Sequence, residues 1–168
     1  APDAAPAWQG MGDLYLKSGQ FAKAVDCYKR VLDIRPKDAA AHANLATAYA
    51  GQGKAKEEME HLKQAAALSP DEPVIRFNLA AAYEKRGQTP DAVREYARVL
   101  KSNPNDADAL ARLADLTFQS KQYEQAADYY EKLSRIHPTR ASIFVRLGFA
   151  RGELKQYAAS AEDYEKAV

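Results

Sequence analysis

Apolar residues recur along the chain at steps of three and four, the spacing of one face of an α-helix. Ile75 and Leu79 share one such face, and Ala92 and Tyr96 share a second. Residues 86–88, Arg-Gly-Gln, separate the two faces and suit a tight turn. No segment shows the alternation of a half-buried strand. The pattern predicts two helices joined by a short turn.

This helix–turn–helix pattern repeats every 34 residues. A proline closes four successive repeats, at Pro36, Pro70, Pro104 and Pro138. A column of large apolar residues holds Met11, Leu45, Leu79, Leu113 and Leu147. The next column is small in every copy: Gly12, Ala46, Ala80, Ala114 and Gly148. We expect the small column to let the two helices of a repeat approach closely. A plain antiparallel bundle with a coincidental period is the alternative, and the number of columns with one spacing disfavours it.

The arithmetic closes without insertions. It predicts a leader at 1–4, full repeats at 5–38, 39–72, 73–106 and 107–140, and a partial fifth repeat at 141–168. The first helices are predicted at 6–18, 40–52, 74–86, 108–120 and 142–154. The second helices are predicted at 21–34, 55–68, 89–102, 123–136 and 157–168.

Polar residues mark several helix starts. Asp38, Glu72 and Asp106 end their repeats, where a carboxylate favours the free N–H groups of the next helix. Arg140 stands in that column in the fourth repeat and lacks the effect. Thr89 is predicted to cap a second helix, followed by a proline in the first turn.

The repeat motif resembles the tetratricopeptide repeat. The first repeat carries its pattern at Trp8, Met11, Gly12, Tyr15, Ala24, Tyr28 and Pro36, with methionine in place of the usual leucine. The departures are Glu58, Leu62, Thr117, Arg151 and Ser160. The resemblance implies an all-α, right-handed superhelical α-solenoid of stacked antiparallel helix pairs. It also implies that the first helices line a concave inner wall, and that the wall holds a peptide or a partner's surface.

First-helix positions outside the packed columns are the candidates for that wall. The predicted peptide-binding residues are Asn44, Phe77, Asn78, Arg112, Asp115, Phe118, Arg146 and Phe149. Aromatic residues and arginine are the types that most often anchor binding. We expect a peptide or an amphipathic helix bound across repeats three to five, with apolar anchors and at least one acidic group.

Two alternatives stay open for these residues. Phe77 and Phe149 could instead pack between adjacent first helices. Arg112 could pair on its own helix with Asp108 or Asp115, which would leave Arg146 the freer cation.

Some relatives clamp the acidic C-terminal tails of heat-shock chaperones with two lysines, two asparagines and one arginine from three consecutive first helices. On repeats two to four, Asn78 and Arg112 fit, but Asp108 stands where a lysine is needed. Both lysines are absent in every register, so the sequence predicts no clamp of this kind.

Composition sets the remaining bounds. Of 168 residues, 46% are hydrophobic and 28% charged, and the net charge is +1, which excludes wholesale disorder and a polybasic surface for nucleic acid. No apolar run approaches the roughly 20 residues of a membrane span. The histidines, His42, His61 and His137, occupy different columns, so we predict no metal site and solvated or edge-packed rings. The single cysteine, Cys27, is predicted to be partly exposed.

No phosphate loop or catalytic constellation stands out, so we predict a non-enzymatic protein–protein interaction scaffold without a cofactor. Tyr164, Ala167 and Val168 would form an apolar edge on the last helix. Either the chain is a fragment of a longer protein, the preferred interpretation, or it is a structural module that self-assembles through this repeat, giving a homo-oligomer. A soluble, cytoplasmic or periplasmic location is expected, and the alanine-rich repeats are typical of a bacterial source.

Overall fold

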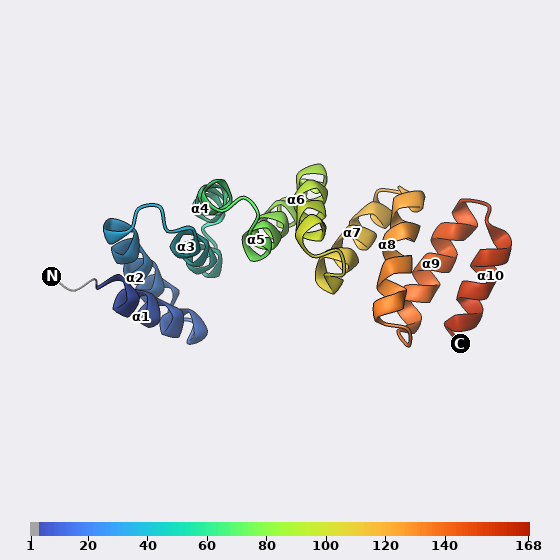
Figure 1. Cartoon of the computed structure of the whole chain (residues 1–168), viewed down its shortest axis with the longest axis horizontal. Helices are drawn as coiled ribbons and strands as arrows, with labels where there is room; N and C mark the ends of the chain where they lie inside the picture. The colour runs from blue at the N-terminus through green and yellow to red at the C-terminus, as the bar shows by residue number, and fades with distance from the viewer. Residues whose placement is uncertain (1–3) are drawn as a thin grey trace. The chain divides into compact units, whose positions relative to one another are not determined.

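The structure, a computed structural model, describes residues 4–168, which form ten α-helices and no strand. The helices are α1 (Ala5–Lys17), α2 (Phe21–Ile34), α3 (Ala39–Gly51), α4 (Ala55–Leu68), α5 (Pro73–Lys85), α6 (Thr89–Ser102), α7 (Ala107–Gln119), α8 (Tyr123–Ile136), α9 (Ala141–Glu153) and α10 (Tyr157–Lys166) (Figure 1). They divide between two compact units, an N-terminal unit (Ala1–Arg86) with α1–α5 and a C-terminal unit (Gly87–Val168) with α6–α10.

The predicted bounds match α2, α4, α6 and α8. The first helix of every repeat begins and ends one residue earlier than predicted, and α10 ends two residues earlier, at Lys166. Of the leader predicted at 1–4, residues 1–3 lie outside the described part of the chain.

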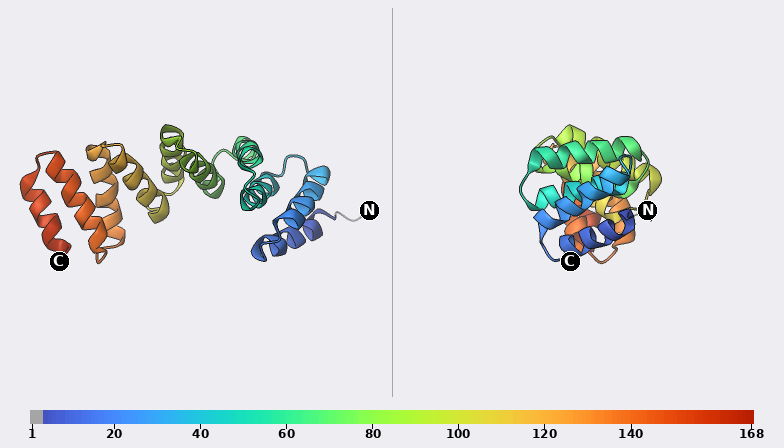
Figure 2. Two further views of the ribbon diagram at one scale, coloured as in Figure 1. Left: turned by 180° about the vertical axis from the view of Figure 1, so that it is seen from behind. Right: turned by 90° about the vertical axis from the view of Figure 1, so that its left-hand side faces the viewer.

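Antiparallel neighbours pack side by side within each unit: α1 with α2 and α3 with α4 in the N-terminal unit, α7 with α8 and α9 with α10 in the C-terminal unit (Figure 2). The small column explains the close approach. A Cβ atom added at Gly12 would lie 2.8 Å from Cζ of Tyr28, and one added at Gly148 would lie 3.2 Å from the ring of Tyr164. The steric prediction for this column is confirmed.

The large column forms much of the buried core. Leu45, Leu79, Leu113 and Leu147 are at most 4% exposed, whereas Met11 is 38% exposed. In the C-terminal unit, one cluster joins α7, α8 and α9 through Leu110, Ala114, Ala126, Tyr130, Leu133, Ile143 and Leu147. In the N-terminal unit, a cluster joins α3, α4 and α5 through Ala46, Leu62, Ala65, Ile75 and Leu79. These cores fix the first helices that carry the candidate site.

The turn inside each repeat places one residue in the left-handed region. The φ angle is +71° at Gly19, +72° at Gly53 and +68° at Gly87, but +58° at Lys121 and +61° at Lys155. A side chain at such a φ crowds the backbone, and glycine avoids the cost. The turns before α8 and α10 therefore carry strain that the other three avoid.

Two of the three predicted carboxylates cap the helix that follows them. The side chains of Asp38 and Asp106 each accept a hydrogen bond, from the amides of Ala41 and Ala109, both at 2.9 Å. Glu72 occupies the same position without a side-chain cap bond. The predicted cap at Thr89 is wrong, because α6 already begins at that residue and the residue in the N-cap position is Gln88, which makes no side-chain cap bond.

The departures from the repeat pattern are accommodated by local polar bonds. The buried hydroxyl of Thr117 donates to the carbonyl of Leu113 at 2.6 Å, and that of Ser160 donates to the carbonyl of Gly148 at 2.7 Å. Arg151 pairs with the carboxylate of Asp163, which is 1% exposed, at 2.7 Å. Packing is therefore preserved where the sequence leaves the pattern.

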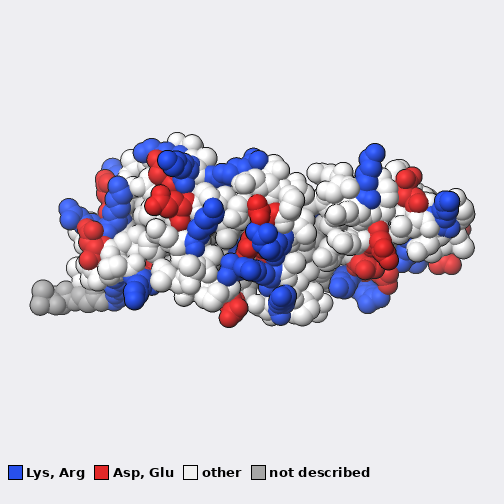
Figure 3. All heavy atoms as spheres, turned by 90° about the horizontal axis from the view of Figure 1, so that it is seen from above, with Lys and Arg blue, Asp and Glu red and all other residues white. Residues whose placement is uncertain are grey.

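Charged side chains of both signs are interspersed on the face drawn in Figure 3. Within residues 4–168, no helix combines the length and the apolar character needed to cross a bilayer.

Candidate functional site

Three polar side chains of the C-terminal unit meet where α7, α8 and α9 pack. The hydroxyl of Tyr130 on α8 donates a hydrogen bond to Oδ1 of Asp115 on α7 at 2.6 Å. The guanidinium of Arg146 on α9 forms an ion pair with the same oxygen and lies 3.2 Å from the Tyr130 hydroxyl. The side chains of Asp115 and Arg146 are 43% and 46% exposed. The triad thus presents one negative and one positive charge at the surface.

Burial and the Asp115 carboxylate raise the pKa of Tyr130 far above its usual range. The hydrogen bond from Arg146 to Tyr130 raises the pKa of that guanidinium, against the smaller opposing effect of burial. The phenol therefore keeps its proton and the arginine its charge at physiological pH. The cluster is suited to hold charged groups in place and not to transfer protons.

Aromatic rings lie directly beside the triad. The ring of Phe118 lies 5.4 Å from that of Phe149, 5.7 Å from that of Tyr123 and 6.1 Å from that of Tyr130, between centroids. Phe149 is 44% exposed, although it also contacts Tyr123 at 6.0 Å. Large apolar side chains are the usual energetic anchors of an interface. The C-terminal unit therefore offers an apolar surface next to a charged one.

A cavity of about 140 Å³ opens beside the triad. Its lining residues are Ala111, Asp115, Tyr130, Leu133, Arg140, Ser142, Ile143 and Arg146. A site for a drug-sized ligand measures about 300–1,000 Å³, so this cavity has room for a single side chain. Arg140 and Arg146 give it two positive charges against the one negative charge of Asp115.

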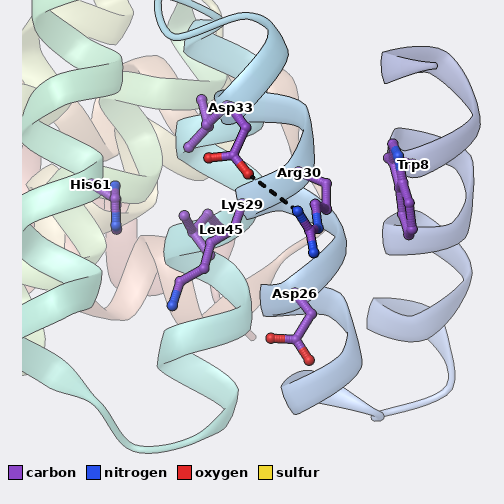
Figure 4. A pocket seen from close by; sticks show the side chains of 8 residues that line it. Trp8, Asp26, Lys29, Arg30, Asp33, Leu45 and His61 are labelled. Atoms are coloured by element: carbon purple, nitrogen blue, oxygen red, sulfur yellow. Dashed lines mark ion pairs between the residues drawn. The ribbon is translucent and has the colours of Figure 1, made fainter.

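A larger cavity, of about 640 Å³, lies in the N-terminal unit (Figure 4). Its lining residues are Trp8, Asp26, Lys29, Arg30, Leu32, Asp33, Leu45 and His61. The charges are mixed, and Arg30 and Asp33 pair at 3.8 Å along α2. The positive and negative charges in the wall balance, so charge does not indicate which kind of ligand this cavity would bind.

Two predictions about reactive side chains are wrong. Cys27 is 4% exposed, because its position on α2 turns toward the interior, and burial raises the pKa of its thiol. His42 is 8% exposed and lies against His61, so the His42 ring is not solvated, whereas His61 and His137 are half-buried. Within the described range 4–168, no group of three or more His, Cys, Asp or Glu side chains could hold a metal ion.

Profiles of one repeat family match most of the chain. A profile described as "TPR repeat" matches residues 12–53, and two described as "Tetratricopeptide repeat" match residues 39–72 and 77–141. The chain is a tetratricopeptide-repeat protein. No curated protein matches it in sequence.

Solved structures share the tetratricopeptide-repeat fold. A crystal structure of MamA protein superposes with a TM-score of 0.85 at 22% identity, over 99% of this chain and 91% of that one. The MamA of Desulfovibrio magneticus RS-1 gives 0.81 at 19%, over 98% and 93%. YrrB, described as a TPR protein with an unusual peptide-binding site, gives 0.81 at 17%, over 95% and 82%. These likenesses confirm an all-α solenoid of stacked antiparallel helix pairs.

In this tetratricopeptide-repeat chain, the predicted binding residues fall in both units. Asp115, Phe118, Arg146 and Phe149 come together in the C-terminal unit, as described above, and Arg112 lies on the same helix as Asp115.

The other three predicted residues belong to the N-terminal unit. Asn44 on α3 donates to Oδ1 of Asp13 at 3.4 Å. Asn78 on α5 lines a cavity of about 150 Å³ with Thr47, and Phe77 is half-buried on the same helix. The predicted residues are therefore divided between the two units.

The structure bears on one of the open alternatives. Arg146 forms an ion pair with Asp115. Phe149 packs against Phe118 of the adjacent first helix, as the structural alternative held, and still remains 44% exposed.

Sequence reasoning missed the tyrosine of the triad. Tyr130 is not among the predicted binding residues, but its hydroxyl donates a hydrogen bond to Asp115 on α7. A signal existed, because an equivalent triad occurs in the N-terminal unit. There Tyr28 donates to Asp13 at 2.6 Å and Asn44 donates to the same oxygen at 3.4 Å. Each member precedes its counterpart by 102 residues (130 − 28, 115 − 13 and 146 − 44), which is three repeats.

Proposed function

We propose that the chain is a protein-interaction scaffold and that the α7/α9 face of its C-terminal unit, formed by Asp115, Phe118, Arg146 and Phe149, binds a peptide or a partner helix. The observation that carries the proposal is the half-exposed Phe149 ring, which lies beside a half-exposed ion pair on one surface. Apolar anchors next to oriented charges are typical of specific protein contacts.

The expected ligand follows from this surface. An apolar side chain of the ligand would cover Phe149 and Phe118, because these rings still expose apolar area to water. A carboxylate would bind between Arg140 and Arg146 in the adjoining cavity, where the positive charges exceed the negative one. The cavity volume of about 140 Å³ fits one acidic side chain and not a larger group.

The fold favours this proposal by analogy. YrrB, which shares the fold, is described as having a peptide-binding site. Fold likeness at 17% identity does not transfer its ligand, so the ligand class is argued from the residues of this chain.

The test is a selection of random peptides displayed on phage against the full chain, followed by affinity measurements on purified variants. We expect Phe149→Ala and Arg146→Gln each to weaken the selected peptides by at least about tenfold, the equivalent of about 1.4 kcal/mol. Tyr157→Ala is the matched control, because Tyr157 is an aromatic residue that is 68% exposed on α10 and is not one of the four residues that form this face. Equal binding by all three variants would contradict the proposal.

Sedimentation of the free chain tests the self-association alternative. A mass that rises with concentration, and that the selected peptides do not lower, would favour assembly over peptide binding. A mass that stays at 18.5 kDa favours the binding surface.

A further inference from the structure

We propose that His42 and His61 form a proton-sensitive clasp that holds α3, α4 and the turn before α3 together, and that the clasp opens when both rings become charged. The pair lies in the N-terminal unit and is independent of the α7/α9 face.

The hydrogen-bond geometry fixes the tautomers of the neutral pair. Nδ1 of His42 lies 3.0 Å from Nδ1 of His61, and Nε2 of His42 lies 3.2 Å from the carbonyl oxygen of Pro36. A carbonyl oxygen only accepts, so Nε2 of His42 carries the hydrogen. Nδ1 of neutral His42 is then an acceptor, and Nδ1–H of His61 must donate to it.

This arrangement tolerates one added proton but not two. A proton on Nε2 of His61 leaves the bond from its Nδ1 to His42 intact. A second proton, on Nδ1 of His42, would set two N–H groups against each other at 3.0 Å and place two positive rings in contact. The clasp therefore has a closed state with zero or one charge and an open state with two.

The surroundings oppose the charged state. His42 is 8% exposed, and the His61 ring stacks on His42 at 5.3 Å and on Tyr49 at 5.6 Å. Burial lowers the pKa of His61, and the neighbouring His42 lowers it further. Burial disfavours the ionised form of any group that lacks a compensating partner.

Charged and polar groups approach the pair from several elements. Lys29 on α2 also lowers the pKa of His61, whereas Glu60 and a hydrogen bond with Gln64, both on α4, raise it. Lys54 lies 5.7 Å over the Tyr49 ring that supports His61. The other charged residues that line the same cavity as His61 are Asp26, Arg30 and Asp33.

Solvent protons can reach the pair. His61 forms part of the wall of the cavity of about 640 Å³, and Figure 4 shows its ring on α4 at one side of the labelled residues. The pair is thus buried enough to disfavour charge and open enough to titrate.

The next repeat makes the equivalent bond with a residue that does not titrate. Arg76, 34 residues after His42, donates from Nε to the carbonyl of Pro70 at 2.6 Å, as His42 does to Pro36. Arginine stays charged at every physiological pH. Of these two equivalent bonds, only the one at His42 is made by an imidazole ring, whose other nitrogen contacts a second helix.

The sign of the effect follows from the lowered pKa. An unfolded histidine titrates near 6.5, and the folded chain binds a proton at His61 only at lower pH. The neutral pair therefore stabilises the fold fully above that value, and part of this stability is lost as the pH falls towards the lowered pKa of His61. Opening of the clasp requires the further proton, on Nδ1 of His42.

The experiment follows the ring nitrogen signals of all three histidines in the full chain by NMR between pH 8 and pH 4.5, with amide hydrogen exchange measured across the same range. We expect the pair to take up its second proton well below pH 6.5, the ordinary pKa of a histidine. We also expect exchange in α3 and α4, corrected for its intrinsic pH dependence, to rise at least tenfold more than in α9 as that proton binds.

Variants separate the clasp from general acid unfolding. The urea midpoint of the wild type should fall between pH 7.5 and pH 5 by more than that of His61→Gln, and His137→Gln should follow the wild type. Independent titration of both rings near 6.5, or an unchanged pH dependence in His61→Gln, would overturn the proposal. The ring titration needs only wild-type protein, so it decides the matter even where a variant does not fold.

Discussion

Two glycines in α1 should respond in opposite directions to the same substitution. Gly12 faces α2, where an added Cβ would lie 2.8 Å from Cζ and 2.9 Å from Cε1 of Tyr28. That ring is fully buried and its hydroxyl is bonded to Asp13, so it cannot move aside freely. Gly10 lies in the same helix with nothing within 4 Å of its added Cβ.

The magnitudes follow from two effects. Replacing glycine by alanine inside a helix gains roughly 0.5–1 kcal/mol of stability through lost backbone freedom in the unfolded chain. Forcing a methyl group into a packed contact costs typically about 1–3 kcal/mol. Gly10→Ala should therefore stabilise the protein by about 0.5–1 kcal/mol, and Gly12→Ala should destabilise it by about 1–2 kcal/mol.

Urea unfolding followed by circular dichroism gives both free energies of unfolding, and hydrogen exchange in α1 and α2 locates the change. A stabilising Gly12→Ala, or equal effects at the two positions, would refute the steric explanation of the small column.

Three further predictions concern the C-terminal unit. Arg151→Met leaves the Asp163 carboxylate, 1% exposed, without this ion pair and should cost about 3 kcal/mol in urea unfolding. Arg135→Met is the control, because Arg135 also pairs with Glu131 but has a side chain that is 73% exposed. Its loss should lower the free energy of unfolding by less than about 1 kcal/mol, and equal losses in the two variants would contradict the reasoning. Lys121→Gly should raise the free energy of unfolding by roughly 0.5–1 kcal/mol, because glycine adopts the left-handed backbone without strain. Gly53→Ala should lower the free energy of unfolding by at least as much. A destabilised Lys121→Gly would show that the φ of +58° at Lys121 carries no strain. Tyr130→Phe removes the hydroxyl that orients Asp115 and Arg146. It should lower the free energy of thermal unfolding by about 1 kcal/mol and weaken binding of the selected peptides several-fold. Unchanged affinity would show that this hydroxyl contributes to stability alone.

The helices were predictable because the same sequence pattern occurs in every repeat. A turn residue such as Gly53 and a closing proline such as Pro36 occur at a fixed step, so ambiguity in one copy is resolved by the others. The first helices were placed one residue late because Asp38 and its equivalents lie immediately before the helix and not one residue further away.

The candidate site was predictable only in part. Side chains at first-helix surface positions, such as Arg146 and Phe149, were identified from their columns. The contribution of Tyr130 was not, because a tyrosine in a packed column can bury its ring and still extend its hydroxyl to a polar edge.

The histidine pair was missed for a different reason. His42 and His61 are 19 residues apart and share no helical spacing, so a search for ligands along one helix does not join them. They lie on either side of the Gly53 turn, on helices that run antiparallel, and this register brings them together. Pairing positions across the turn of each repeat would have revealed the contact.

The most direct test of the binding surface is an NMR titration of the full chain with a selected peptide. We predict that the amide and side-chain signals that move will cluster on α7 and α9, around Phe118, Arg146 and Phe149, while those of the exposed Tyr157 on α10 stay in place. Shifts confined to the second helices, or to the N-terminal unit alone, would contradict the account.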